Sequence, residues 1–317
     1  MIDLDEILKN AKTIGISGHV RPDGDCIGST LAMYNYIRDY YPQAQPQIYL
    51  EIVPNIFKFL NRSEEVLTDY PEVGQMDLFI ALDCGDAGRV GKAAKYYELA
   101  DRTLCIDHHE TNGAFADDNY IVPSASSTCE LVYELLPKDR ITKEIAECLY
   151  TGIIHDTGVF QYSCTSSRTM NIAGELMDKG IDYPGIIDRT FYTKTYRQNL
   201  LLGRALSKSR LYLDGKCILS FLTQEEMQEF DALPKDLEGI VSQLRVTKDV
   251  KVAVFFYPAG EEGGYKFSTR ATGDGINLAT LALRFGGGGH AKAAGFTLHG
   301  TIDEVTDTIL RALEELL

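Results

Sequence analysis

Histidine and aspartate side chains of the kind that bind divalent metal ions gather in four short segments of this sequence. The segments are His19–Asp25 (HVRPDGD), Asp83–Asp86 (DCGD), Asp107–His109 (DHH) and His155–Gly158 (HDTG). Carboxylate and imidazole ligands without thiolates suit Mn²⁺ or a similar cation. Their number exceeds the needs of one catalytic ion and favours two ions about 3.5–4 Å apart, which would activate water and neutralise charge on a phosphoryl group. The residues therefore predict metal-dependent hydrolysis of a phosphoester.

Each of these segments has an ordinary structural explanation when it is considered alone. An aspartate after a strand often caps a helix or turns the chain, and Asp-Gly-Asp is common in loops. A His-His pair by itself is weak evidence. Four of the six histidines lie in these segments, however, and a fifth, His290, follows a run of four glycines that is a further candidate site, so only His299 lies elsewhere. The joint placement of the segments favours a metal site.

Apolar runs alternate with helical patterns in the first half of the chain. Strands are expected at residues 12–18, 46–52, 77–83 and 102–106, and helices at 26–40, 91–99, 126–136, 142–154 and 167–179. Apolar strands separated by helices predict an α/β fold with a parallel, Rossmann-like sheet covered on both faces. Ligands bind outside the carboxyl ends of such strands, where three of the four segments lie. The segments are thus expected to meet at one edge of the sheet, together with the end of the helix that carries Asp156.

The pattern changes after about residue 185, which predicts a second domain. A polar helix is expected at 195–208, then strands at 210–213, 216–222, 251–257, 265–271 and 294–298, and helices at 237–244, 277–285 and 302–317. The expected division is a metal-binding domain at 1–185, a linker helix at 186–208 and a smaller α+β domain at 209–317.

The composition limits the location and the partners of this chain. Its formal net charge of −15 weighs against a protein that grips a long nucleic acid through a basic face. The apolar runs are too short to span a membrane, and the first ten residues lack the basic start and apolar stretch of a secretion signal. Seven scattered cysteines without a CxxC pair favour reduced thiols. A cytoplasmic protein without a membrane partner is expected.

The four segments together resemble the motifs of the DHH phosphoesterase superfamily. They read HVRPDGDCIGS, LDCGD, DHH and HDTG in the family's order, and GGGGHAKAAGF in the second half is similar to the signature of the DHH-associated C-terminal domain. The resemblance covers nearly the whole chain and is greatest to the two-domain nano-RNases. Members of that group act as oligoribonucleases, and some also remove the 3′-phosphate of phosphoadenosine phosphate. Cys26 is a mild departure, because the family usually has a small residue such as alanine there.

The resemblance also implies roles for individual residues of the first domain. One metal ion would be bound by His19, Asp23 and Asp83, and a second by Asp25, Asp83, His108 and Asp156, with Asp83 as the bridging ligand and Mn²⁺ as the expected metal. Asp107 would orient a neighbouring histidine. His109 would face the scissile phosphate as a hydrogen-bond donor or general acid, unless it is only a packing residue.

In the second domain, the resemblance implies residues that bind the substrate. The backbone N–H groups of Gly287, Gly288 and Gly289 would form an anion-binding nest. Arg270 and His290 would hold the substrate phosphate or the terminal nucleotide. The ordinary explanations are a loop that ends a helix for the glycines and a surface salt bridge for Arg270.

The sequence therefore predicts a phosphoesterase that hydrolyses short oligonucleotides to nucleoside monophosphates. Phosphoadenosine phosphate and cyclic or linear dinucleotides are rival substrates. An inorganic pyrophosphatase of the same superfamily is disfavoured, because its basic cluster resembling Ser-Arg-Lys-Lys is absent here. The alternative from another class is a nucleotide sensor without turnover, against which the intact ligand set argues. The oligomeric state stays open, a homodimer included.

Overall fold

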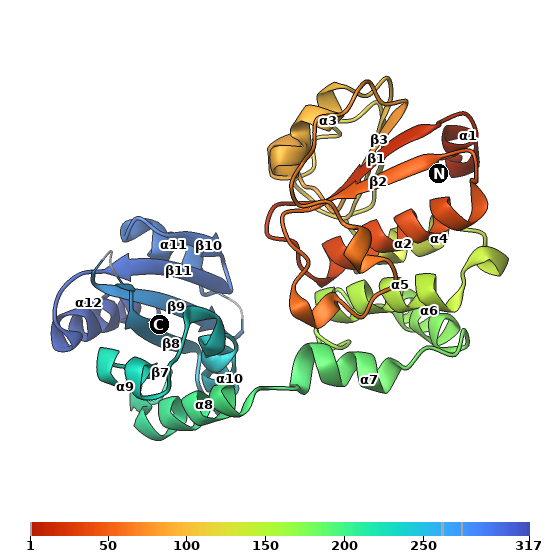
Figure 1. Ribbon diagram of the computed structural model, residues 1–317. Coiled ribbons are helices and arrows are strands. Elements are labelled where there is room, and N and C mark those ends of the chain that lie inside the picture. Colours follow the sequence, from red (N-terminus) through yellow and green to blue (C-terminus); the bar gives the residue numbers. More distant parts are fainter. Residues whose placement is uncertain (1, 261–262, 274) are drawn as a thin grey trace. The chain divides into compact units, whose positions relative to one another are not determined.

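The chain folds into two compact units in the computed structural model, which describes residues 2–260, 263–273 and 275–317 (Figure 1). Unit 1 ends at Thr193 and unit 2 begins at Lys194. Helix α8 (Tyr196–Lys208) lies in the segment expected as a linker, and it packs against β7 (Cys217–Phe221) and α10 (Ile240–Arg245) of unit 2. Within the described ranges, no helix is both long and apolar enough to cross a membrane.

Unit 1 is built on five parallel strands in the order β2-β1-β3-β4-β5, which confirms the predicted α/β fold. The strands are β1 (Thr13–Ser17), β2 (Gln45–Tyr49), β3 (Leu78–Leu82), β4 (Thr103–Asp107) and β5 (Asp118–Ile121). The edge strand β5 was not predicted, because its sequence DNYI is short, largely polar and only half-buried. The strand order reverses between β1 and β3, and sheets of this kind bind ligands beyond the carboxyl ends of the strands at that point.

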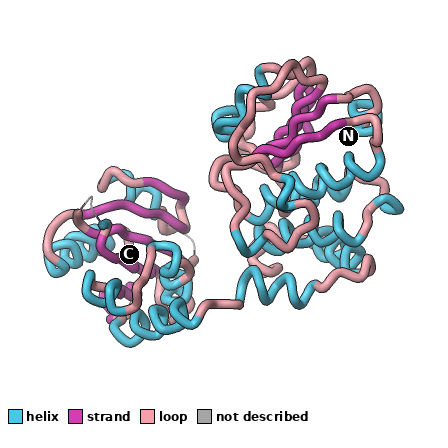
Figure 2. Tube along the Cα trace, viewed as in Figure 1, coloured by secondary structure: helices cyan, strands magenta, loops and turns pink. Residues whose placement is uncertain are grey.

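Both faces of this sheet are covered. Ile14 and Ile16 of β1 belong to the largest apolar core, whereas Phe79 and Ala81 of β3 belong to a smaller core on the other face. The helices of unit 1 are α1 (Leu4–Leu8), α2 (Gly24–Tyr40), α3 (Ala94–Glu98), α4 (Thr128–Leu135), α5 (Lys143–Asp156), α6 (Ser167–Met177) and α7 (Tyr183–Ile187). Helices α2, α4 and α5 contribute to the larger core and form a layer against the sheet (Figure 2).

The close approach of α2 and α5 brings two functional segments together. A Cβ atom at Gly152 of α5 would meet Cys129 Sγ at 2.2 Å and Asp25 Oδ1 at 2.7 Å. Only glycine therefore fits where α5 passes the first turn of α2. This packing brings the last turn of α5, which carries Asp156, to the same end of the unit as Asp25.

Unit 2 contains a six-stranded mixed sheet in the order β10-β11-β9-β8-β7-β6. The remaining elements are β6 (Arg210–Tyr212), α9 (Gln224–Glu229), β8 (Val252–Pro258), β9 (Tyr265–Ala271), α11 (Leu278–Arg284), β10 (Gly288–His290), β11 (Ala293–Leu298) and α12 (Ile302–Glu314). Helices α11 and α12 share one apolar core with one face of this sheet, and α8 and α10 share another core with the opposite face. The expected α+β architecture is present.

The glycine run of unit 2 differs from the expected loop. Gly286 follows Phe285, the C-cap of α11, and has a φ of +70°, as expected where a helix ends. Gly288, Gly289 and His290 then form strand β10, which pairs antiparallel with β11. Strand pairing occupies part of the backbone that was expected to form an anion-binding nest.

Candidate metal centre

The carboxyl ends of β1, β3 and β4 deliver the histidine and aspartate segments to one edge of the unit 1 sheet. His19 lies two residues beyond β1, Asp83 directly follows β3, and His108 directly follows β4. Asp23 is the N-cap of α2, where its Oδ1 accepts hydrogen bonds from the N–H groups of Asp25 and Cys26, both at 3.1 Å. The start of α2 is thereby fixed to the loop after β1.

Asp83 lies between the two histidines of this centre. Its Oδ2 is 3.4 Å from His19 Nε2, and its Oδ1 is 3.6 Å from His108 Nε2. His19 Nε2 is also 3.6 Å from Asp23 Oδ1, and His108 Nε2 is 3.1 Å from Asp156 Oδ2. One carboxylate thus faces both histidines, which is the arrangement that a bridging ligand requires.

Three groups of possible metal ligands result from these positions. In each group, one donor atom per residue lies within 4.8 Å of the others: His19, Asp23 and Asp83; Asp25, His108 and Asp156; and Asp83, His108 and His109. The structure therefore brings together all six residues expected to bind metal, and it places His109 beside them. The first two groups coincide with the two expected ligand sets, except that Asp83 does not join the second.

Asp83 adopts an uncommon backbone conformation. Its φ is +57°, in the left-handed region that aspartate tolerates better than most residues, and its side chain is buried. Its N–H group donates to the carbonyl oxygen of Ile106 in the neighbouring strand at 3.1 Å. Such a conformation costs free energy and persists where the surrounding structure enforces it, as it does at many functional sites.

The N-terminus of α4 holds the fully buried Asp25. The N–H groups of Thr128 and Cys129 donate to Asp25 Oδ2 at 2.6 Å and Oδ1 at 2.9 Å. The hydroxyl of Thr128 donates to Asp83 Oδ1 at 3.2 Å. A helix N-terminus stabilises a carboxylate in this position. Thr128 was missed as a functional residue, because the sequence identifies the start of a helix there but not the aspartate that it meets.

The charges of this centre fit the binding of divalent cations. Burial, followed by the nearby Asp83 and Asp156, raises the pKa of Asp25 well above its usual value. Burial alone would lower the pKa of His19 and His108, but neighbouring carboxylates outweigh it and raise each to about 10. In the described part of the chain, no lysine or arginine forms an ion pair with these carboxylates. Metal ions would supply the missing positive charge, in competition with protons on the histidines.

His19 is oriented so that its Nε2 atom is available to a metal. Its Nδ1 lies 2.8 Å from the carbonyl oxygen of Val20, to which the Nδ1–H donates. This hydrogen bond fixes the tautomer and directs Nε2 toward the carboxylates of Asp23 and Asp83.

The pair of Asp107 and His109 is present as expected. His109 Nδ1 donates to Asp107 Oδ1 at 2.7 Å, and the side-chain amide of Asn112 donates to Asp107 Oδ2 at 2.7 Å. The hydrogen bond with Asp107 raises the pKa of His109, which favours the imidazolium form. Asn112 was not singled out from the sequence, because a lone asparagine in a loop carries no pattern that links it to a buried aspartate.

His155 has a structural position that the sequence did not reveal. A Cβ atom at Gly24 would meet the His155 ring at 2.2 Å, so the ring packs directly on the backbone between Asp23 and Asp25. Phe57 and Phe191 lie against the other sides of the ring, with centroids at 4.9 and 4.5 Å. Burial lowers the pKa of His155 to about 4, so this histidine is neutral near neutral pH and supports the Asp-Gly-Asp turn.

Two of the residues expected to bind substrate in unit 2, Arg270 and His290, lie on one face of its sheet. Arg270 in β9 pairs with Ala293 in β11, which pairs with His290 in β10. Directly paired residues project to the same face of a sheet. Arg270 and His290 therefore share a face, with the small side chain of Ala293 between them, while Gly288 and Gly289 belong to the edge strand and Gly287 precedes it.

A cluster of carboxylates and imidazoles at the carboxyl edge of a parallel sheet can hold the divalent ions that a metal-dependent phosphoesterase needs. Comparison with protein-family models agrees: residues 13–153 match the DHH family, N-terminal domain, and residues 214–317 match the DHHA1 domain. The chain belongs to the DHH family. It is therefore a phosphoesterase of a metal-dependent family, and the predicted enzyme class is confirmed.

Full-length relatives support the same assignment. The chain is 31% identical to the bifunctional oligoribonuclease and PAP phosphatase NrnA of Thermus thermophilus, over 98% of this chain and 93% of the relative. It is 27% identical to the protein of the same name from Bacillus subtilis, over 96% and 94% of the two chains. The crystal structure of an exopolyphosphatase-related protein from Bacteroides fragilis has a TM-score of 0.88 and 30% identity, with coverage of 98% and 94%.

Proposed function

We propose that this protein hydrolyses short oligoribonucleotides to nucleoside monophosphates with two Mn²⁺ ions, and that it also accepts 3′-phosphoadenosine 5′-phosphate. The observation that carries this proposal is the position of Asp83, whose two carboxylate oxygens face His19 and His108. The names of the relatives from Thermus thermophilus and Bacillus subtilis support the choice of substrates. The proposal includes a cytoplasmic location, which the seven unpaired cysteines support.

The proposed roles follow the geometry of unit 1. One ion would be held by His19, Asp23 and Asp83, and the other by Asp25, Asp83, His108 and Asp156. When bound, the ions would acidify water and offset negative charge on the phosphoryl group. Asp107 holds His109 by its Nδ1 atom, which leaves Nε2 to donate a hydrogen bond or a proton to a substrate oxygen. Asn112 keeps the carboxylate of Asp107 in place, and the N-terminus of α4 does the same for Asp25.

The distribution of charge supports a short substrate. Acidic residues outnumber basic residues by 30 to 16 within residues 1–193. A long strand along this surface would bring many phosphates against like charge, whereas an oligonucleotide of a few residues brings few. In unit 2, Arg270 and His290 would bind the substrate phosphate or the terminal nucleotide.

A substrate panel with identification of the products tests the proposal. Purified protein loaded with Mn²⁺ should convert 5′-labelled RNA of two to five nucleotides to monophosphates, and should release phosphate from phosphoadenosine phosphate. Cyclic and linear dinucleotides belong in the same panel as rival substrates. Complete inertness toward every member would refute the proposal. Nucleotide binding with fewer than two ions per chain would instead favour a sensor without turnover.

A further inference from the structure

One face of the unit 2 sheet is only partly covered by helices. The apolar core that contains α8 and α10 includes Ala253, Phe255 and Tyr257 of β8 but no residue of β9 or β11. Beyond β8, the same face presents side chains that are at least partly exposed. From β9 these are Lys266, Ser268 and Arg270, and from β11 they are Ala293, Gly295 and Thr297. Charged residues therefore border an open strip of small side chains.

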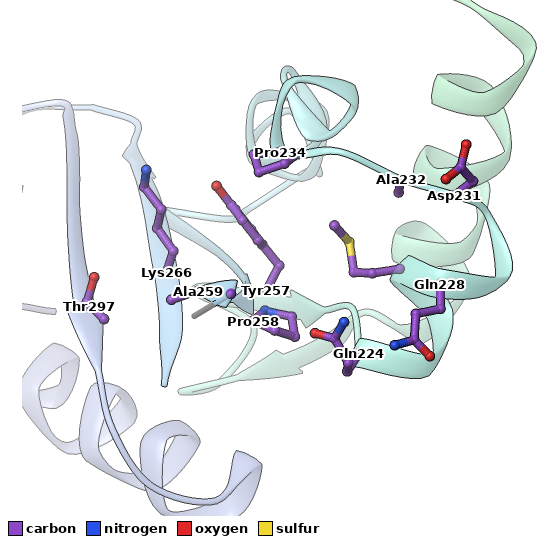
Figure 3. Close-up of a pocket in the computed structure, with 12 residues that line it drawn as sticks. Gln224, Gln228, Asp231, Ala232, Pro234, Tyr257, Pro258, Ala259, Lys266 and Thr297 are labelled. Atoms are coloured by element: carbon purple, nitrogen blue, oxygen red, sulfur yellow. The ribbon is translucent and has the colours of Figure 1, made fainter. Parts of the chain in front are cut away.

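Two hollows lie along this strip. The first has a volume of about 610 Å³, and the second, of about 550 Å³, shares Pro234, Tyr257 and Lys266 with it. The second hollow extends to Arg270. Figure 3 shows Lys266 and Tyr257 extending side by side from neighbouring strands toward Pro234 in the first hollow. The hollows thus form one groove that connects Lys266 with the expected phosphate-binding residue Arg270.

The first hollow offers the contacts that a nucleotide needs. Met227, Pro234 and Tyr257 provide an apolar wall, against which a base can pack. Gln224 and Gln228 lie one helical turn apart on α9, and their amides can both donate to and accept from the edge of a base. The amino group of Lys266 can pair with a phosphate.

We propose that this hollow is a second nucleotide subsite, in which Lys266 binds the phosphate of a nucleotide further along the oligonucleotide than the one at Arg270 and His290. This inference rests on the proposed function and names the part of the substrate that the groove receives. A dinucleotide bound at Arg270 and His290 would be too short to reach this subsite, whereas a substrate of three or more nucleotides would occupy it.

The spacing of the cations supports an elongated ligand. Lys266 and Arg270 are four residues apart on β9, which places their backbones about 13 Å apart along the strand. Ser268 of β9 and Gly295 of β11 lie in the row between them, so neither of these two strands places a large side chain in the interval. A ligand whose two contacted phosphates are separated by more than one nucleoside, as in a trinucleotide, suits this arrangement better than a single phosphate or two adjacent phosphates do.

The net charge of the groove also favours an anion. Among the residues that the structure describes, the acidic ones that line it are Asp231 and Glu238. Arg197 binds Asp231 at 3.0 Å, and the charge of Lys235 offsets that of Glu238. Within the described residues, Lys266 has no ion-pair partner, so its positive charge remains available to a ligand.

Replacement of Lys266 tests this subsite. Lys266→Met should raise KM for RNA of three to five nucleotides by about 10-fold and leave KM for a dinucleotide within about twofold, because only the longer substrates lose a charged contact. Lys266→Arg should restore most of the affinity. The control is Lys248→Met, which removes another exposed lysine of unit 2 that lines neither hollow.

Equilibrium binding in EDTA gives a second readout that does not depend on turnover. For a trinucleotide, the slope of log K against the logarithm of the salt concentration should be less steep by about 0.7 for Lys266→Met than for the unmodified protein. A loss of equal size for every length, or no loss at any length, would overturn the subsite. If the unmodified protein binds oligonucleotides without hydrolysing them, the proposed function fails, while a length-dependent loss of binding would still support the subsite.

Discussion

Units 1 and 2 present charge in opposite ways. Unit 1 gathers carboxylates and histidines at the ends of β1, β3 and β4. Apart from the exposed Asp23, these side chains are buried or half-buried, and helix termini and hydrogen bonds fix them. Unit 2 has 16 acidic and 15 basic residues within residues 194–317, and it exposes cations on an open sheet face. A fixed, buried site suits stabilisation of a transition state, whereas an exposed face suits the binding of a flexible ligand. Substitutions in unit 1 should therefore lower kcat, and substitutions in unit 2 should raise KM.

The largest effect is expected from Asp83→Ala. This change removes the carboxylate that faces both His19 and His108, so kcat should fall by about 10⁴-fold or more. Bound metal, measured by elemental analysis after Mn²⁺ loading, should fall below two ions per chain. Asp178→Ala is the control, because Asp178 is an exposed residue at the end of α6. A variant that keeps a tenth of the activity would refute the role of Asp83.

A smaller effect on kcat is expected from Asp107→Asn. The amide keeps the shape of the side chain but loses the charge that holds His109 by its Nδ1 atom at 2.7 Å. Loss of such an orienting partner costs about 10- to 100-fold in activity. Steady-state kinetics should show the loss in kcat with little change in KM. Asp118→Asn in the half-buried edge strand β5 is the control, because it changes an ion pair with Arg102 that lies outside the metal centre. Equal losses of kcat in both variants would contradict the role assigned to Asp107.

In unit 2, Arg270→Met should act on KM instead. Loss of one charged contact with the substrate should raise KM by about 10-fold and change kcat by less than about threefold. Arg284→Met serves as the control, because Arg284 on α11 pairs with Glu315 and lines neither hollow of the proposed subsite. If Arg270→Met lowers kcat as strongly as Asp107→Asn does, the division of labour between the two units is wrong.

Local sequence patterns could predict the residues that strands deliver. His19, Asp83 and His108 follow apolar strands, and the rule that parallel strands present their carboxyl ends at one edge was enough to bring them together. The strand order was not needed for this step. The resemblance to a known family then supplied the expected roles, which the distances around Asp83 support.

Contacts between segments far apart in the chain could not be predicted in the same way. The hydrogen bond from Thr128 to Asp25 joins residues 103 positions apart, and it depends on how α4 packs beside α2. The contact of His155 with Gly24 depends in turn on the packing of α5. The strand β5 was missed for a different reason, because its residues lack the apolar pattern of a buried strand and pair only at the sheet edge.

The smallest expected effect concerns the pH dependence of stability in the metal-free protein. The folded structure raises the pKa of His19 from 6.5 to about 10, so this imidazolium stabilises the fold below pH 6.5, and that stability is lost as the pH rises toward 10. The raised pKa of buried Asp25 acts in the same direction. In EDTA, the melting temperature should therefore fall between pH 6.5 and pH 9. Mn²⁺ should weaken or reverse this trend, because it displaces those protons. In EDTA, the melting temperature of the variant His19→Gln should depend less on pH than that of the unmodified protein. If the melting temperature of the unmodified protein rises between pH 6.5 and pH 9, the charge balance described for unit 1 is wrong.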